Sequence, residues 1–176
     1  MHIARVEEFA IESQVFTHIG ELLRGAFPGY PLDRPYFKLR PHFRFLAWND
    51  ETLVGHLGVD HRVIRIGAEV LSIFGVIDLC VAPHYQHRSL ATQMLEQLAV
   101  LARQTHRDAI VLFADDHRLY SANGYQRVEA PCTWMMIDDH RTLGIAERPL
   151  GDCMMVKPIT LQRWPDGAVD MLGYLF

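Results

Sequence analysis

The chain has 176 residues, of which 49% are hydrophobic and 22% are charged. This length suits one domain with a continuous hydrophobic core, so we expect residues 1–176 to fold as a single domain. A formal net charge of -4 excludes a nucleic-acid binder that depends on neutralising phosphates. No apolar run approaches the roughly 20 residues that cross a bilayer, which predicts a cytoplasmic protein with no membrane partner.

The first half of the chain predicts one helix and several strands. Met1–Val6 alternates like a short strand, and apolar residues at helical spacing predict a helix within Ile11–Leu23. The prolines of Phe27–Pro41 exclude a long helix, so this segment is expected to be a substrate-facing loop. Three further strands are predicted at Phe43–Ala47, Leu53–Ile66 and Val70–Val81. Short turns between them indicate an antiparallel meander.

The periodicity changes in the second half of the chain. Ser89–Gln104 carries an apolar stripe at helical spacing, and Ser89 is suited to cap that helix. The elements predicted after it are a strand at Ala109–Phe113, a short helix at Asp116–Asn123 capped by Asp115 or Asp116, a strand at Thr133–Ile137 and a final strand after Trp164. This order of strands and helices indicates an α/β domain of the α+β type.

The junction between the central strand and the long helix, Val76–Ala91, is the most informative segment. The first N–H groups of a helix have no partners within the helix, and the helix dipole is positive at that end. A helix that begins directly after a strand and a tight loop therefore attracts phosphate. Arg88, and His87 when protonated, add positive charge that the acidic chain otherwise lacks.

This junction resembles the signature of the GNAT N-acetyltransferase family, which reads Gln or Arg, two residues, Gly, one residue, and Gly or Ala. The segment matches at Gln86 and Ala91 and departs at Ser89, where the family usually has glycine. A glycine keeps side-chain bulk away from the pyrophosphate. Ser89 either crowds that site or donates its hydroxyl as a helix cap.

A second resemblance to the same family lies downstream, in the family's Tyr, three residues, Gly, then Phe or Tyr. The matching residues are Tyr120, Gly124 and Tyr125. In the family this tyrosine is often the general acid for the departing coenzyme A thiolate. A hydroxyl that donates to a poorly solvated thiolate lowers the barrier to its departure.

The resemblance implies a GNAT fold, with a mixed, mostly antiparallel central sheet that is splayed in the middle and has helices on both faces. It implies an enzyme that transfers an acetyl group from acetyl-CoA to a small-molecule or peptide amine by direct attack, with Tyr120 as general acid and no metal. A homodimer is left open. The residues implied to bind the cofactor are Leu79, Cys80, Val81, Gln86, His87, Arg88, Ser89, Leu90, Ala91 and Thr92.

Three other side chains near the junction have competing interpretations. Asp78 lies in an apolar strand, where a carboxylate is costly unless paired, so it is a candidate base with a raised pKa. It could equally cap a neighbouring loop or pair with an arginine. Cys80 has no base motif beside it and is expected to be a buried hydrophobe rather than a nucleophile. His84 and His87 lack the carboxylate or thiol that would complete a metal site.

Three alternative functions are weighed against acetyl transfer. A narrower resemblance to the nodulation protein A group, acyltransferases that use acyl carrier protein, rests on Gly55–Gly58, Val63–Gly67 and Trp164–Gly167. A carrier protein needs a basic docking surface, which favours acetyl-CoA or another short acyl-CoA as donor for this acidic chain. The departure at Ser89 would also suit a sensor that binds coenzyme A without turnover. A purely structural interaction protein leaves both motifs unexplained.

Overall fold

The computed structural model describes all 176 residues, which divide into two compact units. The first unit consists of Met1–Asp60 and Ile77–Leu95, and the second of His61–Val76 and Glu96–Phe176. The elements that contribute residues to both units are β3 (Thr52–Ile66), β4 (Glu69–Val81) and α2 (Leu90–Gln104). The expected single domain over residues 1–176 stays a prediction. None of the helices is long and apolar enough to cross a lipid bilayer.

The first unit is built on three antiparallel strands. β1 (His2–Glu7) pairs with β2 (Phe43–Asn49), and β2 pairs with the first part of β3. Between β1 and β2 the chain forms a 3-10 turn, η1 (Glu8–Ala10), helix α1 (Ser13–Ala26) and a loop over residues 27–42 without helix or strand. A second 3-10 turn, η2 (Pro83–Tyr85), follows β4. The predicted strand, helix, proline-rich loop and meander are confirmed.

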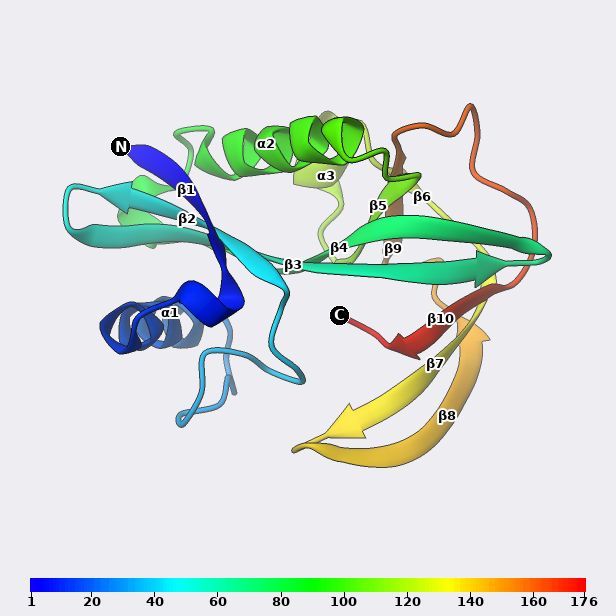
Figure 1. Cartoon of the computed structure of the whole chain (residues 1–176), viewed down its shortest axis with the longest axis horizontal. Helices are drawn as coiled ribbons and strands as arrows, with labels where there is room; N and C mark the ends of the chain where they lie inside the picture. The colour runs from blue at the N-terminus through cyan, green and yellow to red at the C-terminus, as the bar shows by residue number, and fades with distance from the viewer. The chain divides into compact units, whose positions relative to one another are not determined.

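The helices of the first unit cover opposite faces of these strands. Neighbouring residues of a strand point to opposite faces. Leu46 shares a hydrophobic cluster with Leu23 of α1, whereas its neighbour Ala47 lies beside Gly55 and the start of α2. A Cβ built on Gly55 would lie 3.2 Å from Met94 of α2, so glycine allows the helix this close approach. Figure 1 shows α1 and the start of α2 on the two sides of β2 and β3.

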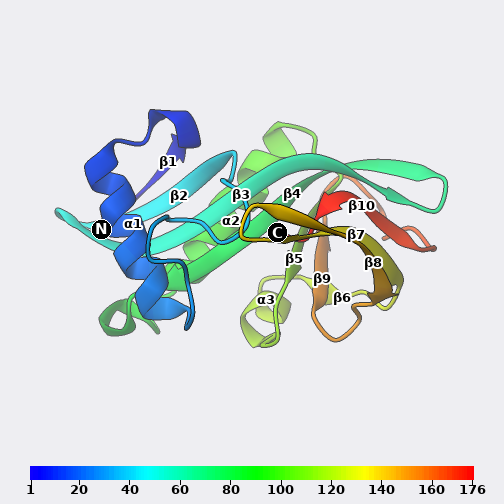
Figure 2. The same cartoon turned by 90° about the horizontal axis from the view of Figure 1, so that it is seen from below.

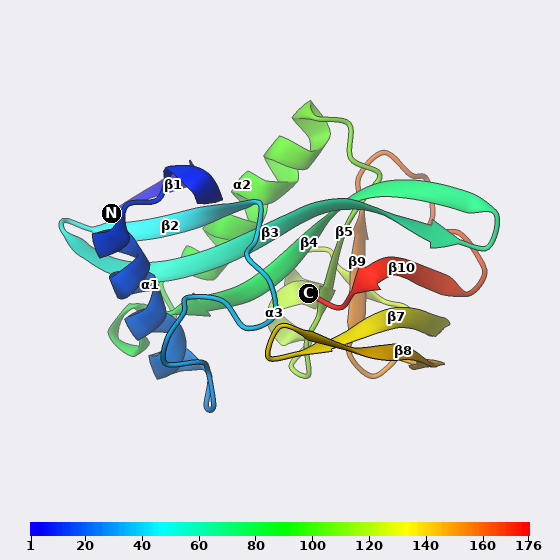
Figure 3. The same cartoon turned by 60° about the horizontal axis from the view of Figure 1, so that its bottom comes forward.

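The second unit holds a mixed sheet with the strand order β6-β9-β5-β4-β3-β10-β7-β8. Its further strands are β5 (Ala109–Phe113), β6 (Gln126–Arg127), β7 (Pro131–Asp138), β8 (Arg141–Pro149), β9 (Met154–Pro158) and β10 (Val169–Tyr174). Figure 2 shows β9 beside β5, and Figure 3 shows the β7–β8 hairpin beside β10. The β4–β5 and β7–β10 pairs are parallel, whereas β5–β9, β6–β9, β7–β8 and β3–β10 are antiparallel.

β4 and β5 separate after a short parallel contact. Only Ile73–Gly75 pairs with Ala109–Val111, although β4 continues to Val81 and β5 to Phe113. This early end of the pairing is the splay that was expected in the middle of the sheet. The expected final strand after Trp164 is confirmed as β10.

Strands β6, β8 and β9 were not predicted from the sequence, and the short helix was predicted to be longer than it is. β8 is a mostly exposed strand with Arg and Glu side chains, and β9 is short and begins with two methionines, so neither shows alternation. Helix α3 covers only Arg118–Ala122. Asp116 does cap it, because its carboxylate accepts the Arg118 backbone N–H at 3.0 Å.

The chain end packs on β4 within the second unit. The ring of Phe176 lies against Gly75, where a built Cβ would come within 2.5 Å of the ring. The same ring contacts Phe113, with centroids 5.5 Å apart, and the Arg62 guanidinium lies 4.6 Å from its centroid. Phe176 can occupy this place because residue 75 has no side chain.

Candidate functional site

The backbone of β4 turns into the left-handed region at Asp78, whose φ is 50°. A non-glycine residue with this φ inside a strand is strained, and such residues persist only where their surroundings hold them. The Asp78 carbonyl accepts a hydrogen bond from His56 Nδ1 at 2.8 Å. The regular strand predicted over Val70–Val81 therefore needs a correction, because it contains an irregular residue at the candidate base.

The carboxylate of Asp78 is held by a tyrosine from the loop after α1. The Tyr30 hydroxyl donates to Asp78 Oδ2 at 2.7 Å, and Tyr30 itself is buried. Burial raises the pKa of Asp78, while the Tyr30 hydrogen bond and the positive charges of Arg44 and Lys38 lower it. Burial and the Asp78 charge together raise the pKa of Tyr30, so its hydroxyl remains a donor. The raised pKa predicted for Asp78 is thus found.

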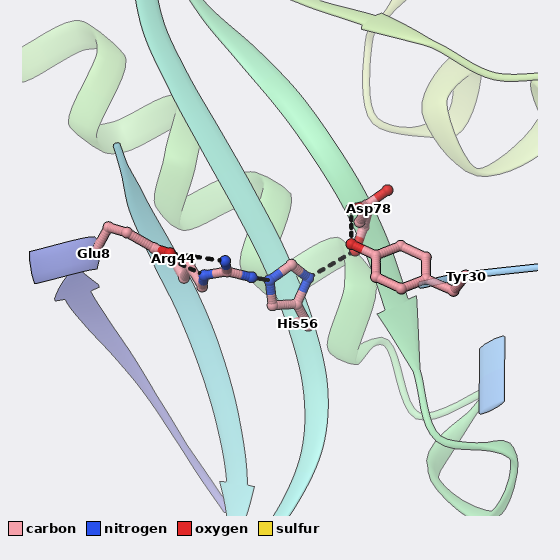
Figure 4. A network of polar contacts seen from close by, with 5 residues as sticks. All are labelled: Glu8, Tyr30, Arg44, His56 and Asp78. Carbon is pink, nitrogen blue, oxygen red and sulfur yellow. Dashed lines mark hydrogen bonds and ion pairs between the residues drawn. The ribbon is translucent and has the colours of Figure 1, made fainter. Parts of the chain in front are cut away.

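A chain of polar groups extends from Asp78 through His56 and Arg44 to Glu8, the residue that follows β1 (Figure 4). Arg44 donates to both carboxylate oxygens of Glu8, from Nε at 2.7 Å and from Nη2 at 3.1 Å. Its Nη1 lies 2.8 Å from Nε2 of His56. Arg44 is 1% exposed, His56 is 0% exposed and Glu8 is 8% exposed. These three residues are called the buried relay below.

The contacts of His56 fix its protonation state. A guanidinium can only donate, so Nε2 of His56 accepts, and a carbonyl can only accept, so Nδ1 of His56 carries the proton. The ring is therefore neutral. Burial and the nearby charge of Arg44 lower its pKa to about 3, so it stays neutral at physiological pH.

The loop between β4 and α2 is exposed and tightly folded. His87 and Ser89 both have a φ of 59°, in the left-handed region. Gln86 Nε2 donates to the carbonyl of Val81 at 3.1 Å, and the Ser89 carbonyl accepts the first helical bond, from the Gln93 N–H at 2.9 Å. The helix begins at Leu90, directly after Ser89, the residue that the sequence suggested as its cap.

The residues of β4 that were expected to face the cofactor differ in their burial. Leu79 and Val81 are partly exposed, whereas Cys80 is buried in the cluster that contains Leu23 and Leu46. Burial and the Asp78 charge raise the pKa of the Cys80 thiol to about 12. The thiol is thus protonated and inert, as expected for a small buried hydrophobe.

Tyr120 belongs to the second unit, where its helix is firmly held. Lys157 Nζ donates to the Asn123 carbonyl at 2.8 Å at the end of α3, and Gly124 follows with a φ of 81°. The Tyr120 ring meets Tyr125 edge-on, with centroids 5.9 Å apart. Burial and the charge of Asp116 raise the pKa of Tyr120 to about 12, so its hydroxyl is protonated at neutral pH.

Two further histidine environments bear on the chemistry. His84 and His87 are exposed, and no group of three or more His, Cys, Asp or Glu side chains is arranged to hold a metal ion. His42 Nδ1 lies 2.6 Å from Oδ1 of Asp60, and Asp60 is 2% exposed. This His–Asp pair, Tyr30 and the buried relay were not predicted from the sequence, because each of these contacts joins residues from different elements.

Comparison with known proteins gives a family match. A model of the Acetyltransferase (GNAT) domain matches residues 12–128 of the chain. No curated protein sequence matches significantly. The nodulation protein A likeness finds no support in these comparisons.

Solved structures with a similar fold share little sequence identity with the chain. The GNAT family N-acetyltransferase YhbS from Escherichia coli, in complex with CoA, is 17% identical with a TM-score of 0.64, over 97% of this chain and 90% of its own. A GNAT family acetyltransferase from Brucella melitensis, in complex with acetyl-CoA, is 14% identical with a TM-score of 0.60, over 96% of this chain and 94% of its own. Eis1 from Mycobacterium abscessus is 15% identical with a TM-score of 0.62, but the 76% of this chain that aligns spans only 34% of Eis1.

Proposed function

Because the chain belongs to the GNAT acetyltransferase family and is therefore an acyltransferase, we propose that it transfers an acetyl group from acetyl-CoA to a primary amine. The observation that carries the proposal is the exposed loop between β4 and α2. Ser89 stands where the family signature has glycine, and it adopts the left-handed conformation that glycine favours. This conformation supports a phosphate-binding role for the loop, which directly precedes the free N–H groups of α2.

A coenzyme A thioester is the donor class that the comparisons support, since two proteins of similar fold were crystallised with CoA and acetyl-CoA. The proposal narrows this class to acetyl-CoA or another short acyl-CoA. An acidic acyl carrier protein would meet a chain whose own net charge is -4, which disfavours docking. The cofactor-binding residues proposed are those of the junction, Leu79–Val81 and Gln86–Thr92.

The proposed reaction is direct attack, with a role for each named group. Asp78 accepts a proton from the acceptor amine, whose nitrogen then forms the new bond to the thioester carbonyl. A backbone N–H within Leu79–Val81 donates to the oxyanion that develops. The C–S bond breaks as Tyr120 donates its hydroxyl proton to the departing thiolate, and Tyr120 regains a proton from solvent. Exclusion of water makes the thiolate more basic. This favours proton transfer from Tyr120 to the thiolate, although the pKa of Tyr120 is raised.

The acceptor is proposed to be a small-molecule or peptide amine that approaches Asp78 from the side of Tyr30. Tyr30 donates to one carboxylate oxygen, Oδ2, which leaves Oδ1 to receive the amine. The loop that carries Tyr30 also contains Lys38, whose charge acts on Asp78. Acceptor selection is therefore assigned to residues 27–42; from the sequence, we expected acceptor contacts from Phe27–Phe43 and from the C-terminus.

A panel of amines supplied with acetyl-CoA, with release of the free thiol as readout, tests the proposal. A steady thiol release that requires both an amine and the enzyme supports it. The donor is tested by comparing kcat/KM for acetyl-CoA, a long-chain acyl-CoA and an acylated carrier protein with one accepted amine. Preference for the carrier protein would overturn the donor assignment. A thermal shift with acetyl-CoA but no turnover with any amine would instead indicate the sensor.

A further inference from the structure

Burial of the relay in the interior of the first unit costs desolvation free energy. Glu8, Arg44 and His56 lie in the interior, where apolar side chains could pack without the free-energy cost of desolvating charged and polar groups. A buried ion pair contributes little net stability, because desolvation of both ions offsets their attraction. Every polar atom of the relay that contacts a neighbour does so at hydrogen-bond distance, from 2.7 to 3.1 Å. Such an arrangement fixes geometry more than it stabilises the fold.

The relay ends on the strained residue of β4. His56 donates its only N–H to the carbonyl of Asp78, whose φ of 50° points the residue away from the regular strand. Arg44 fixes the His56 ring from the other side, and Glu8 holds Arg44 through two parallel bonds. Three residues that lie one behind another therefore end on the backbone of Asp78, whose carboxylate is bonded to Tyr30.

The titratable groups that interact with Asp78 come from several elements of the first unit. They are Tyr30 and Lys38 from the loop after α1, Arg44 from β2, the neutral His56 from β3 and Cys80 from β4. Arg44 favours the ionised form of Asp78, and Glu8 offsets part of that effect because it pairs with Arg44. Glu8 thus adjusts a carboxylate that it does not touch.

We propose that Glu8, Arg44 and His56 are positioning residues that hold the Asp78 carboxylate toward the acceptor amine and set the pH range over which it accepts a proton. This inference rests on the proposed function, since it takes Asp78 as the base of the acetyl transfer. His56 supplies the positioning through the Asp78 backbone. The charges of the Glu8–Arg44 pair set the pH range over which the Asp78 carboxylate takes up a proton.

The electrostatic part predicts opposite effects for the two members of the pair. Glu8→Gln leaves the positive charge of Arg44 uncompensated, so the acid limb of the kcat/KM profile should move to lower pH by about one unit. Arg44→Met removes that positive charge, so the limb should move to higher pH by about one unit. The double variant keeps no lone buried charge and should fall between the single variants. The same acceptor amine is used for every variant, so the titration of the amine contributes equally to each pH profile and cancels in the comparison.

The positioning part concerns His56. His56→Phe removes the N–H donor to Asp78 and should lower kcat about 100-fold, the effect of misplacing a reacting group by about 1 Å. The dissociation constant of acetyl-CoA should stay unchanged. His56→Gln, whose amide can still donate, should recover part of the activity. Equal losses in His56→Phe and His56→Gln would overturn the positioning role.

A control variant and a second readout separate this inference from simpler explanations. Ile19→Val removes one methylene from the same unit and should lower the unfolding midpoint without moving the acid limb. Titration of the Asp78 carboxyl carbon by NMR follows the same pH shifts in the absence of any substrate. If the wild-type chain is inactive, but the NMR titration shows the pKa of Asp78 moving in opposite directions in Glu8→Gln and Arg44→Met, the proposed function is refuted and the electrostatic effect of the relay on Asp78 is supported. Shifts of the same sign, or none, in both variants would refute the relay itself.

Discussion

Replacing Ser89 by glycine tests why the signature loop tolerates a serine. Ser89 has a φ of 59°, and a left-handed conformation costs a residue with a Cβ about 1–2 kcal/mol. Glycine removes that cost but loses about 0.5–1 kcal/mol through the greater freedom of the unfolded chain. The net expectation for Ser89→Gly is a gain of about 0.5 kcal/mol in the free energy of unfolding.

The matched control is the same substitution in a right-handed helix. Ser121 is exposed and lies in α3, so Ser121→Gly brings only the unfolded-state loss of about 0.5–1 kcal/mol. The two variants should differ by about 1–2 kcal/mol, which is the strain at Ser89 alone. Denaturant unfolding at constant m-value measures both. Equal losses in Ser89→Gly and Ser121→Gly would refute the claim that the loop is strained at this residue.

The same variant decides between the two roles considered for the Ser89 side chain. If its bulk crowds the pyrophosphate, Ser89→Gly binds acetyl-CoA more tightly and Ser89→Ala changes little. If its hydroxyl donates to the ligand, both variants bind more weakly. We expect the first result, because Ser89 stands at the glycine position of the family signature and adopts the left-handed conformation that glycine favours. Isothermal titration of the three chains gives the answer.

Three further substitutions have expected outcomes. Tyr120→Phe should keep acetyl-CoA affinity and lower kcat about 10- to 1000-fold. The prediction fails if kcat of the variant equals that of the wild type while pre-steady-state kinetics show that the chemical step is rate-limiting. Tyr30→Phe removes a donor to a carboxylate and should lower the free energy of unfolding by about 1.5–3 kcal/mol. The Tyr30 hydrogen bond lowers the pKa of Asp78, so it stabilises the ionised carboxylate. The loss of unfolding free energy in Tyr30→Phe should therefore be complete at a pH where Asp78 is ionised and should shrink as the pH falls and Asp78 takes up its proton. Denaturant unfolding at a series of pH values measures this. Gly75→Ala places a Cβ against the Phe176 ring and should cost about 1–3 kcal/mol, a loss that a double-mutant cycle with Phe176→Ala should show to be non-additive.

The parts of the structure that follow from local patterns were predicted well. The proline-rich loop, the long strands β3 and β4 and helix α2 each have a strong periodicity or a clear terminating residue. The strand–loop–helix junction was found for the same reason, since a β-branched run, a proline and a helical stripe follow one another directly. Family resemblance then assigned a role to Tyr120, which composition alone would have left as one aromatic among several.

The polar network of the first unit could not be predicted, because its contacts join distant parts of the chain. Tyr30 and Asp78 are 48 residues apart, and Glu8 and Arg44 are 36 residues apart. The alternation of β2 suggested one apolar face, but both faces are covered by helices, so Arg44 is buried as well. His56 could be named only as a residue between two glycines. The left-handed backbone at Asp78 has no signal in its neighbours at all.

The sharing of β3 and β4 between the two units has a consequence for anyone who tries to dissect the chain. The polypeptide passes from one unit to the other three times, after Asp60, after Val76 and after Leu95. A single truncation therefore cannot isolate either unit. A chain that ends at Leu95 keeps the first unit together with His61–Val76 of the second, and a chain that begins at His61 keeps the second unit together with Ile77–Leu95 of the first. A fragment ending at Asp60 would lack Asp78 and the whole loop before α2. Independent folding of either unit can be examined only with a rearranged gene, in which Met1–Asp60 is joined directly to Ile77–Leu95 by a designed linker.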